Sequence, residues 1–223
     1  MKLVTGILAR NEAASDRYLR RVLTRCLEFS DTVVVLDDNS TDATPDIARE
    51  MGCIVETRTG DAAWGKEAPA RQELWELACQ HATGPNDWLL VCDADQELVG
   101  DVRGLCQSVE VNTWCFVLLD MWSETEYRID GLWQAHTTPR PWLFAVNRTP
   151  DGWVAEWPTR QIHTGHCPVN WPHVTGIAPP DDFHWMHWSY AKPQHRTAKH
   201  RQYMEQTDQL SPSERAHAES ILT

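Results

Sequence analysis

The 223-residue sequence has no long apolar run. Its longest apolar segments, such as residues 32–36 and 88–92, are far below the roughly 18 to 20 residues that a membrane-spanning helix needs, so we expect no span. The first 15 residues have no continuous apolar core either, because Arg10, Asn11 and Glu12 interrupt it. Such a segment is too short for a secretory signal. These two absences predict a cytoplasmic protein.

Positive charge is also scarce, with 20 Lys and Arg against 32 Asp and Glu and a net charge of −12. This balance repels phosphate backbones and acidic lipids, so a nucleic-acid partner is disfavoured. The seven cysteines are odd in number and form no C-x-x-C pair, which indicates neither a zinc ribbon nor a closed disulfide framework. No G-x-G-x-x-G or G-x-x-x-x-G-K-[ST] motif occurs, which argues against a dinucleotide or P-loop site.

The first 100 residues alternate apolar, β-branched runs with helical periodicity. The predicted strands are residues 3–9, 32–36, 53–57 and 88–92, and the predicted helices lie within residues 19–27, 45–51 and 66–81. Continuously apolar strands that alternate with helices predict an α/β fold with a mostly parallel sheet covered on both faces. Later segments are more irregular, with short strands expected over 114–119 and 142–146, a helix over 192–209 and a last helix opened by Ser211 and Glu214.

Three polar segments follow predicted strands, namely residues 10–12, 37–42 and 93–95. Ligands bind beyond the carboxyl ends of such strands, so we expect these segments to converge on one acidic site. Asp93 and Asp95 form a D-x-D pair whose oxygens suit Mg²⁺ or Mn²⁺, although an isolated D-x-D also occurs in solvated turns. Asp37 and Asp38 stand where acidic residues accept hydrogen bonds from a ribose or base, whereas residues up to Asp42 suit capping of the next helix.

These segments resemble the family-2 glycosyltransferases of the GT-A fold. The resemblance rests on V-T-G-I-L-A-R-N-E at 4–12, V-V-V-L-D-D-N-S-T-D-A-T at 33–44 and W-L-L-V-C-D-A-D at 88–95. Later segments are similar to the branch that includes lipopolysaccharide core transferases, through R-P-W-L-F at 140–144, Trp157 with Ile162-His163, H-W-S-Y at 187–190 and K-H-R-Q-Y at 199–203. The resemblance implies one GT-A-like domain over 1–223, with a nucleotide-sugar-binding half (1–100), an irregular, Trp-rich acceptor-side half (101–190) and a C-terminal helical segment (191–223).

The resemblance also implies the reaction, in which a sugar moves from a nucleotide diphosphate sugar to a hydroxyl acceptor with Mn²⁺ or Mg²⁺ and inversion at the anomeric carbon. A glycan is the first expectation for the acceptor, ahead of a protein side chain or a modified DNA base. The implied donor-binding residues are Arg10, Glu12, Asp38, Arg71, Asp93 and Lys199. The implied metal ligands are Asp93, Asp95 and His187, with Asp95 the most direct.

The catalytic base is left open by the sequence. Where the family has V-H-E, this chain has Ile162-His163-Thr164, so the glutamate is absent. The candidates for the proton acceptor are Asp120, Glu156 and His163, with Asp181 and Asp182 as further carboxylates. The missing glutamate also keeps open a catalytically degenerate nucleotide-sugar-binding module. A nucleotidyltransferase on a similar fold is a weaker alternative, because Gly6 alone does not supply its Gly-rich basic loop.

Histidine and tryptophan patterns have both ordinary and functional interpretations. The H-x-x-H pairs at His163/His166 and His184/His187 have a zinc-like spacing, but no helix is expected there and we expect no zinc. Nine of the twelve Trp follow residue 100, where a single Trp is best interpreted as core. Collectively, we expect one or two of five to border an acceptor groove: Trp122, Trp133, Trp142, Trp153 and Trp157. The basic stretch after residue 192 is either a solvated face or, through Lys199, a partner of the diphosphate.

Overall fold

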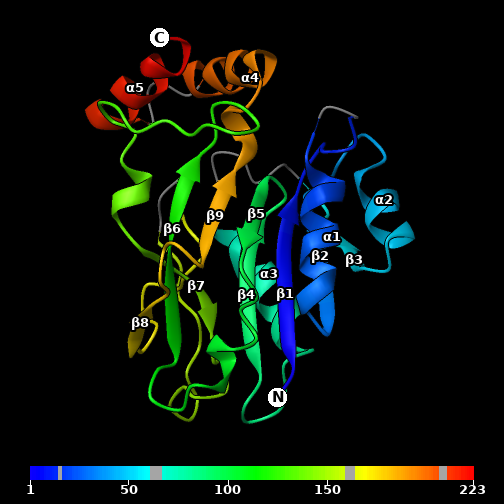
Figure 1. The fold of residues 1–223 in the computed structure, drawn as a ribbon. Helices are drawn as coiled ribbons and strands as arrows, with labels where there is room; N and C mark the ends of the chain where they lie inside the picture. The colour runs from blue at the N-terminus through cyan, green and yellow to red at the C-terminus, as the bar shows by residue number, and fades with distance from the viewer. Residues whose placement is uncertain (15–16, 61–66, 159–163, 206–209) are drawn as a thin grey trace.

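A mixed β-sheet forms the centre of the computed structural model, which describes residues 1–14, 17–60, 67–158, 164–205 and 210–223. The strand order is β3-β2-β1-β4-β7-β6-β9-β5, and β8 pairs with β6 (Figure 1). The strands are β1 (Leu3–Ala9), β2 (Thr32–Asp37), β3 (Ile54–Thr57), β4 (Trp88–Asp93), β5 (Gln96–Val99), β6 (Thr113–Asp120), β7 (Arg140–Phe144), β8 (Thr175–Ile177) and β9 (His184–His187).

The first four strands form the parallel, doubly covered sheet that the sequence predicts. β3, β2, β1 and β4 are parallel to one another. The helices between them are α1 (Leu19–Phe29), α2 (Thr44–Glu50) and α3 (Glu67–Cys79). Val33 and Val35 of β2 belong to the core that contains α1 and α2, whereas Val34 and Leu36 belong to the core that contains α3. Both faces of β2 are therefore buried, which explains its unbroken apolar run.

Beyond β4 the sheet becomes mixed. β7 is antiparallel to both β4 and β6, whereas β9 is parallel to β6 and antiparallel to β5. The strand expected over 142–146 lies two residues earlier, as β7, and the short strands β5, β8 and β9 were not predicted. In this half of the sheet, β9 lies between β6 and β5. It runs in the same direction as β4, so both strands end at the same edge of the sheet.

Two helices follow β9 and lie together at the same end of the molecule (Figure 1). They are α4 (Pro193–Met204) and α5 (Pro212–Glu219), and α5 begins with the predicted capping box of Ser211 and Glu214. The last residues of the helix expected over 192–209 lie outside the described part of the chain. Within that part, no helix is both long and apolar enough to cross a membrane.

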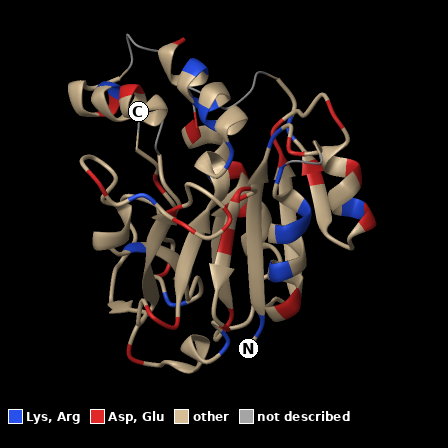
Figure 2. Ribbon diagram, turned by 45° about the horizontal axis from the view of Figure 1, so that its top comes forward, with Lys and Arg blue, Asp and Glu red and all other residues tan. Residues whose placement is uncertain are grey.

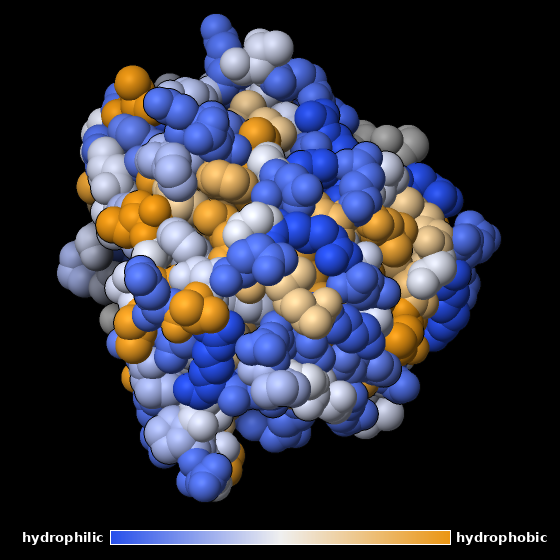
Figure 3. Space-filling view, turned by 60° about the horizontal axis from the view of Figure 1, so that its bottom comes forward, coloured by the Kyte–Doolittle hydropathy of each residue, from blue (hydrophilic) through white to orange (hydrophobic). Residues whose placement is uncertain are grey.

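Tryptophan fills much of the core of the irregular half. Trp75 of α3 has four aromatic neighbours within 6.4 Å between ring centroids, namely Phe144, Trp153, Trp157 and Trp171. Trp133 and Trp142 are 1% and 2% exposed. At the opposite end of the molecule from α4, Figure 3 shows apolar side chains in separate small patches among hydrophilic ones. Of the five Trp that were considered for an acceptor groove, Trp133 and Trp142 are thus buried, whereas Trp122, Trp153 and Trp157 are partly exposed.

Candidate functional site

A cavity of about 420 Å³ lies at the carboxyl ends of β1, β2 and β4, beneath α4. All three polar segments that follow these strands contribute to its wall. Figure 2 shows the acidic strand ends below the basic positions of α4. The lining residues used below are Arg10, Glu12, Asp38, Arg71, Asp93, Asp95, His187, Ser189 and Lys199. The structure therefore brings together every predicted donor-binding and metal-binding residue.

Asp93 is held by two basic side chains. Arg71, only 5% exposed on α3, donates from Nη1 and Nη2 to the two Asp93 oxygens at 2.6 and 3.1 Å. His166 Nε2 lies 3.2 Å from Asp93 Oδ2. Burial alone would raise the pKa of Asp93, but Arg71 and His166 hold it well below its ordinary value. Asp93 is thus an ionised carboxylate whose two oxygens already have partners within the protein.

Asp95 has a different environment, formed by β9 and the residues after it. The Ser189 hydroxyl donates to Asp95 Oδ2, and His187 Nε2 lies 3.6 Å from the same oxygen. The other ring nitrogen of His187, Nδ1, lies 2.8 Å from Asp120 Oδ1. Strand register explains this row, because His187 pairs with Gln96 of β5 on one side and with Asp120 of β6 on the other. Three neighbouring strand ends therefore place two carboxylates on either side of one imidazole.

The charges of this row reinforce one another. Burial alone would lower the pKa of His187, but Asp95 and Asp120 raise it to about 9. The pKa of Asp95 is lowered, against the effect of burial, by His187 and by Lys199. Lys199 lies on α4, and the nearby Tyr203 and acidic residues raise its pKa although burial opposes this. The cavity thus contains fixed charges of both signs, with cations on the side of α4 and β9.

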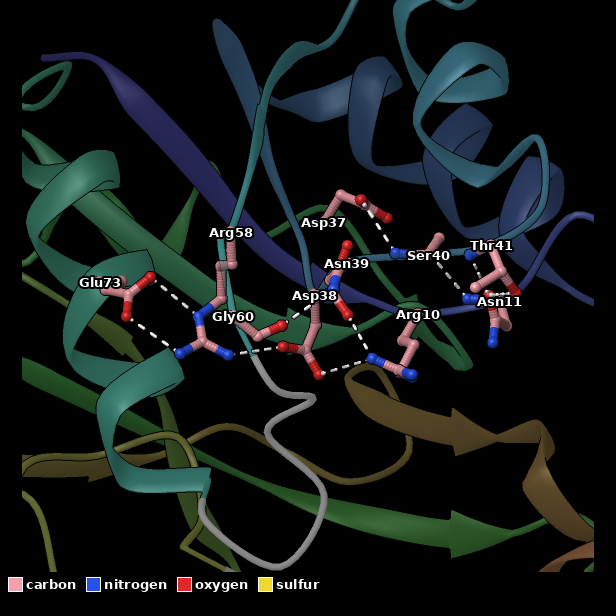
Figure 4. Close-up of polar contacts among 10 residues, drawn as sticks. All are labelled: Arg10, Asn11, Asp37, Asp38, Asn39, Ser40, Thr41, Arg58, Gly60 and Glu73. Carbon is pink, nitrogen blue, oxygen red and sulfur yellow. Dashed lines mark hydrogen bonds and ion pairs between the residues drawn. The ribbon is translucent and has the colours of Figure 1, made fainter.

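Asp38 lies at the opposite end of the cavity, at the end of β2. Its carboxylate is 4% exposed and contacts Arg58, while Arg10 Nη1 donates to the Asp38 backbone oxygen at 2.6 Å (Figure 4). Residues that follow Asp38 have a structural role. Thr41 N donates to Asn11 Oδ1, and the Asp42 carboxylate accepts hydrogen bonds from Thr44 and from Ala13 N. These bonds join the loops after β1 and β2, in line with the capping interpretation of Asp42.

Glu12 is buried in the cavity wall, and its carboxyl group is not fully hydrogen-bonded. Its Oε2 atom has no hydrogen-bond partner and lies 3.8 Å from Arg17 Nε. Burial, followed by repulsion from Asp95, raises the pKa of Glu12 to about 7. In the folded protein, Glu12 is therefore mainly protonated below about pH 7.

We expect Glu12→Gln to change how stability depends on pH. Because folding raises the pKa of Glu12, its favourable contribution is present below about pH 4.5 and is lost as the pH rises through about 7. The variant lacks this titration, so its free energy of unfolding relative to the wild type should increase by about 2 kcal/mol between pH 5 and pH 8. Urea unfolding at both pH values measures this change, and a difference that does not vary with pH would contradict it.

Other candidate residues lie apart from the cavity. Glu156 is exposed, and its backbone pairs with Val169 and Asn170. Asp181 and Asp182 are exposed and precede β9, at the end away from His187. His163 lies outside the described residues. None of these carboxylates is among the described residues that line the cavity.

The two H-x-x-H pairs do not form a zinc site in the described part of the chain. His184 Nδ1 contacts Pro180 O, whereas His187 contacts Asp120. His166 contacts Asp93, and its partner His163 is not described. Among the described residues, no group of three or more His, Cys, Asp or Glu could hold a metal ion by itself.

Sequence reasoning missed Arg58, His166 and Ser189 as neighbours of the acidic residues. His166 and Ser189 reach Asp93 and Asp95 from 73 and 94 residues away, and Arg58 reaches Asp38 from 20 residues away. One signal was available for Ser189, because it belongs to the quoted H-W-S-Y segment.

Comparison with known proteins agrees with this geometry. Residues 6–103, which carry the parallel strands and both acidic segments, match the family model "Glycosyl transferase family 2". Residues 6–103 therefore belong to this family. Uncharacterized glycosyltransferases of Rickettsia bellii (strain RML369-C) and Rickettsia prowazekii (strain Madrid E) are each 33% identical to this chain over 102 residues. The matched segment covers 46% of this chain and 30% of each relative's length.

The fold of the whole chain is similar to that of a solved glycosyltransferase. The mannosyltransferase PcManGT from Pyrobaculum calidifontis, in complex with GDP-Man and Mn²⁺, matches 99% of this chain and 69% of its own with a TM-score of 0.50. The sequence identity is 17%, so the likeness concerns the fold. The GT-A-type α/β fold predicted from the sequence is confirmed, and the predicted family is confirmed for residues 6–103.

Proposed function

We propose that this family-2 chain transfers a sugar from a nucleotide diphosphate sugar to a hydroxyl acceptor with the help of a divalent cation. The observation that carries this proposal is the shared cavity of Asp38, Asp93 and Asp95 at adjacent strand ends, faced by cations on α4 and β9. Such a cavity offers hydrogen-bond acceptors for a nucleoside and positive charge for a diphosphate. The solved PcManGT complex contains GDP-Man and Mn²⁺, which supports the same ligand class for this chain.

Asp95 and His187 are the residues that fit a divalent cation, and His187 Nε2 would lose its proton when the cation binds. Asp95 Oδ2 and His187 Nε2 lie 3.6 Å apart, and both side chains line the cavity. A carboxylate and an imidazole suit Mn²⁺, and Asp120 on the other ring nitrogen orients His187 as a second-layer carboxylate does. When bound, the metal would neutralise charge on the leaving diphosphate. With only two protein ligands, the donor's phosphate oxygens would complete the coordination.

The remaining residues are assigned to different parts of the donor. Asp93 is fixed by Arg71 and His166, which suits a rigid hydrogen-bond acceptor beside the ribose. Lys199 stands over Asp93 and Asp95, where its charge would attract the diphosphate. Direct attack of the acceptor hydroxyl on the anomeric carbon gives inversion, and a glycan is the first acceptor class to test. A single GT-A domain, as expected over 1–223, is part of this proposal.

The base for the acceptor hydroxyl stays a prediction, and kinetics can separate the candidates. We expect Asp120→Asn to weaken Mn²⁺ binding by about 10- to 100-fold, because Asp120 orients His187. Glu156→Gln should leave donor and metal binding unchanged and lower kcat only if Glu156 is the base. Donor Kd, Mn²⁺ affinity and kcat measured for both variants provide the comparison. Unchanged Mn²⁺ binding in Asp120→Asn would leave Asp120 with the role of a base alone.

A thermal-shift panel tests the proposed function itself. The protein would be heated with UDP, GDP, CDP, ADP and TDP sugars, each with and without Mn²⁺, since a ligand that binds only the folded state raises the unfolding temperature. We expect a metal-dependent increase with one nucleotide. No increase with any nucleotide would contradict the proposal. Binding of a donor with neither transfer nor hydrolysis would instead identify a degenerate binding module.

A further inference from the structure

Four charged side chains form a continuous row across the edge of the sheet beside the cavity (Figure 4). Arg58, the residue after β3, donates from Nη1 to Asp38 Oδ1 at 2.5 Å. Its Nε and Nη2 atoms donate to the two oxygens of Glu73 on α3 at 2.8 and 3.0 Å. Arg10 continues the row at the end of β1, with Nη1 3.8 Å from Asp38 Oδ2. The order is therefore Glu73, Arg58, Asp38 and Arg10.

Arg58 reaches Asp38 from outside the cavity. Asp38 and Arg10 line the cavity, whereas Arg58 and Glu73 do not. The side chains of Arg58 and Asp38 are 10% and 4% exposed. The hydrogen bonds that Arg58 donates to Glu73, opposed by burial, raise the pKa of Arg58, and its planar guanidinium is fixed by three directed bonds. Arg58 can thus hold the Asp38 carboxylate in one orientation without contacting a bound ligand.

A carboxylate held in one orientation beside a guanidinium has a definite preference among nucleobases. The carboxylate only accepts hydrogen bonds, and Arg10 only donates them. Uracil and guanine present a ring N–H next to a carbonyl oxygen, which matches this pair. Cytosine and adenine present a ring nitrogen lone pair at that position, which would face the carboxylate without a hydrogen bond.

We propose that Arg58, held by Glu73, is a positioning residue that determines base specificity by fixing the orientation of the Asp38 carboxylate at the cavity wall. The inference rests on the proposed function, because it assigns the nucleoside end of the donor to Asp38. Without Arg58, the carboxylate can rotate, and its oxygens can then accept from the exocyclic amino group of cytosine or adenine as well as from a ring N–H. Loss of Arg58 should therefore weaken discrimination more than it weakens binding as a whole.

The experiment measures dissociation constants of UDP, CDP, GDP and ADP by calorimetry, with Mn²⁺ throughout. We expect the wild type to favour UDP over CDP or GDP over ADP. In Arg58→Met that ratio should fall by about tenfold, the size expected when one buried hydrogen-bonding group changes its partner. Glu73→Gln should lower the ratio less, and Arg58→Lys should restore part of it because one charged donor remains. Arg49→Met is the matched control, since Arg49 pairs with Asp46 on the exposed side of α2.

Two results would overturn this inference while leaving the proposed function intact. One is an equal loss of affinity for all four nucleotides in Arg58→Met, which would show that Arg58 only braces β3 against α3. The other is a wild type that favours CDP and ADP. If the wild type binds none of the four and shows no shift with a TDP sugar, the proposed function fails together with the inference. Should Arg58→Met not fold, Glu73→Gln provides the same ratio from a milder change.

Discussion

Replacing Asp95 with alanine is expected to remove the metal-dependent part of donor binding. Asp95 lines the cavity, and its Oδ2 atom is the oxygen toward which His187 Nε2 and the Ser189 hydroxyl converge. Of the two proposed metal ligands, His187 alone would then remain. Loss of a supporting second-layer group alone costs about 10- to 100-fold in metal affinity, so loss of this ligand should cost at least about 100-fold.

The measurement is the nucleotide Kd of Asp95→Ala with and without Mn²⁺. Metal should tighten binding in the wild type and have almost no effect in the variant. Asp46→Ala is the control for loss of one negative charge, because Asp46 is exposed and pairs with exposed Arg49 on the surface of α2. An Mn²⁺ effect in Asp95→Ala that equals the wild-type effect would remove Asp95 from the metal site.

Arg71→Met is expected to lower the free energy of unfolding by about 3 kcal/mol, the low end of the cost of breaking a buried ion pair. The Arg71 side chain is 6% exposed and makes two hydrogen bonds to Asp93. Its loss leaves the Asp93 carboxylate with His166, whose own pKa is lowered by burial. The low end applies because the Asp93 side chain is 28% exposed toward the cavity.

Urea unfolding tests this effect, with Arg49→Met as a control that should cost less than about 1 kcal/mol because its ion pair is exposed. The double variant Arg71→Met/Asp93→Asn should recover part of the loss, since the amide leaves no uncompensated charge. If Arg71→Met lowers the free energy of unfolding no more than Arg49→Met does, then water and His166 are sufficient to stabilise the Asp93 carboxylate without Arg71.

Local patterns in the sequence were enough to predict the parallel half of the fold. Strands β1, β2 and β4 are continuously apolar because both of their faces are buried, and Ser211 with Glu214 forms a complete capping box. The strands that the sequence did not reveal are short and carry polar residues. β9 contains His184 and His187, and β8 has three residues, so their pairing depends on distant partners.

The candidate site was likewise only partly predictable from the sequence. Asp38, Asp93 and Asp95 follow strands that could be located, and parallel strand ends meet at one edge, so their convergence was predictable. The partners that fix them were not, because Arg58 and His166 come from other parts of the chain. Asp120 was predicted as a base, and only the register of β6 with β9 shows that it contacts His187.

The pairing of β5 with β9 has a consequence for how the protein is made. β5 ends at Val99 and its partner begins at His184, so a ribosome that adds about 5 to 20 residues per second synthesises β9 roughly 4 to 17 s after β5. During that interval the nascent chain already carries Asp95, while β5 has no strand along the edge that β9 will cover. An unpaired edge of this kind invites association with other chains. Nascent chains should therefore depend on chaperones until residue 187 has left the ribosome.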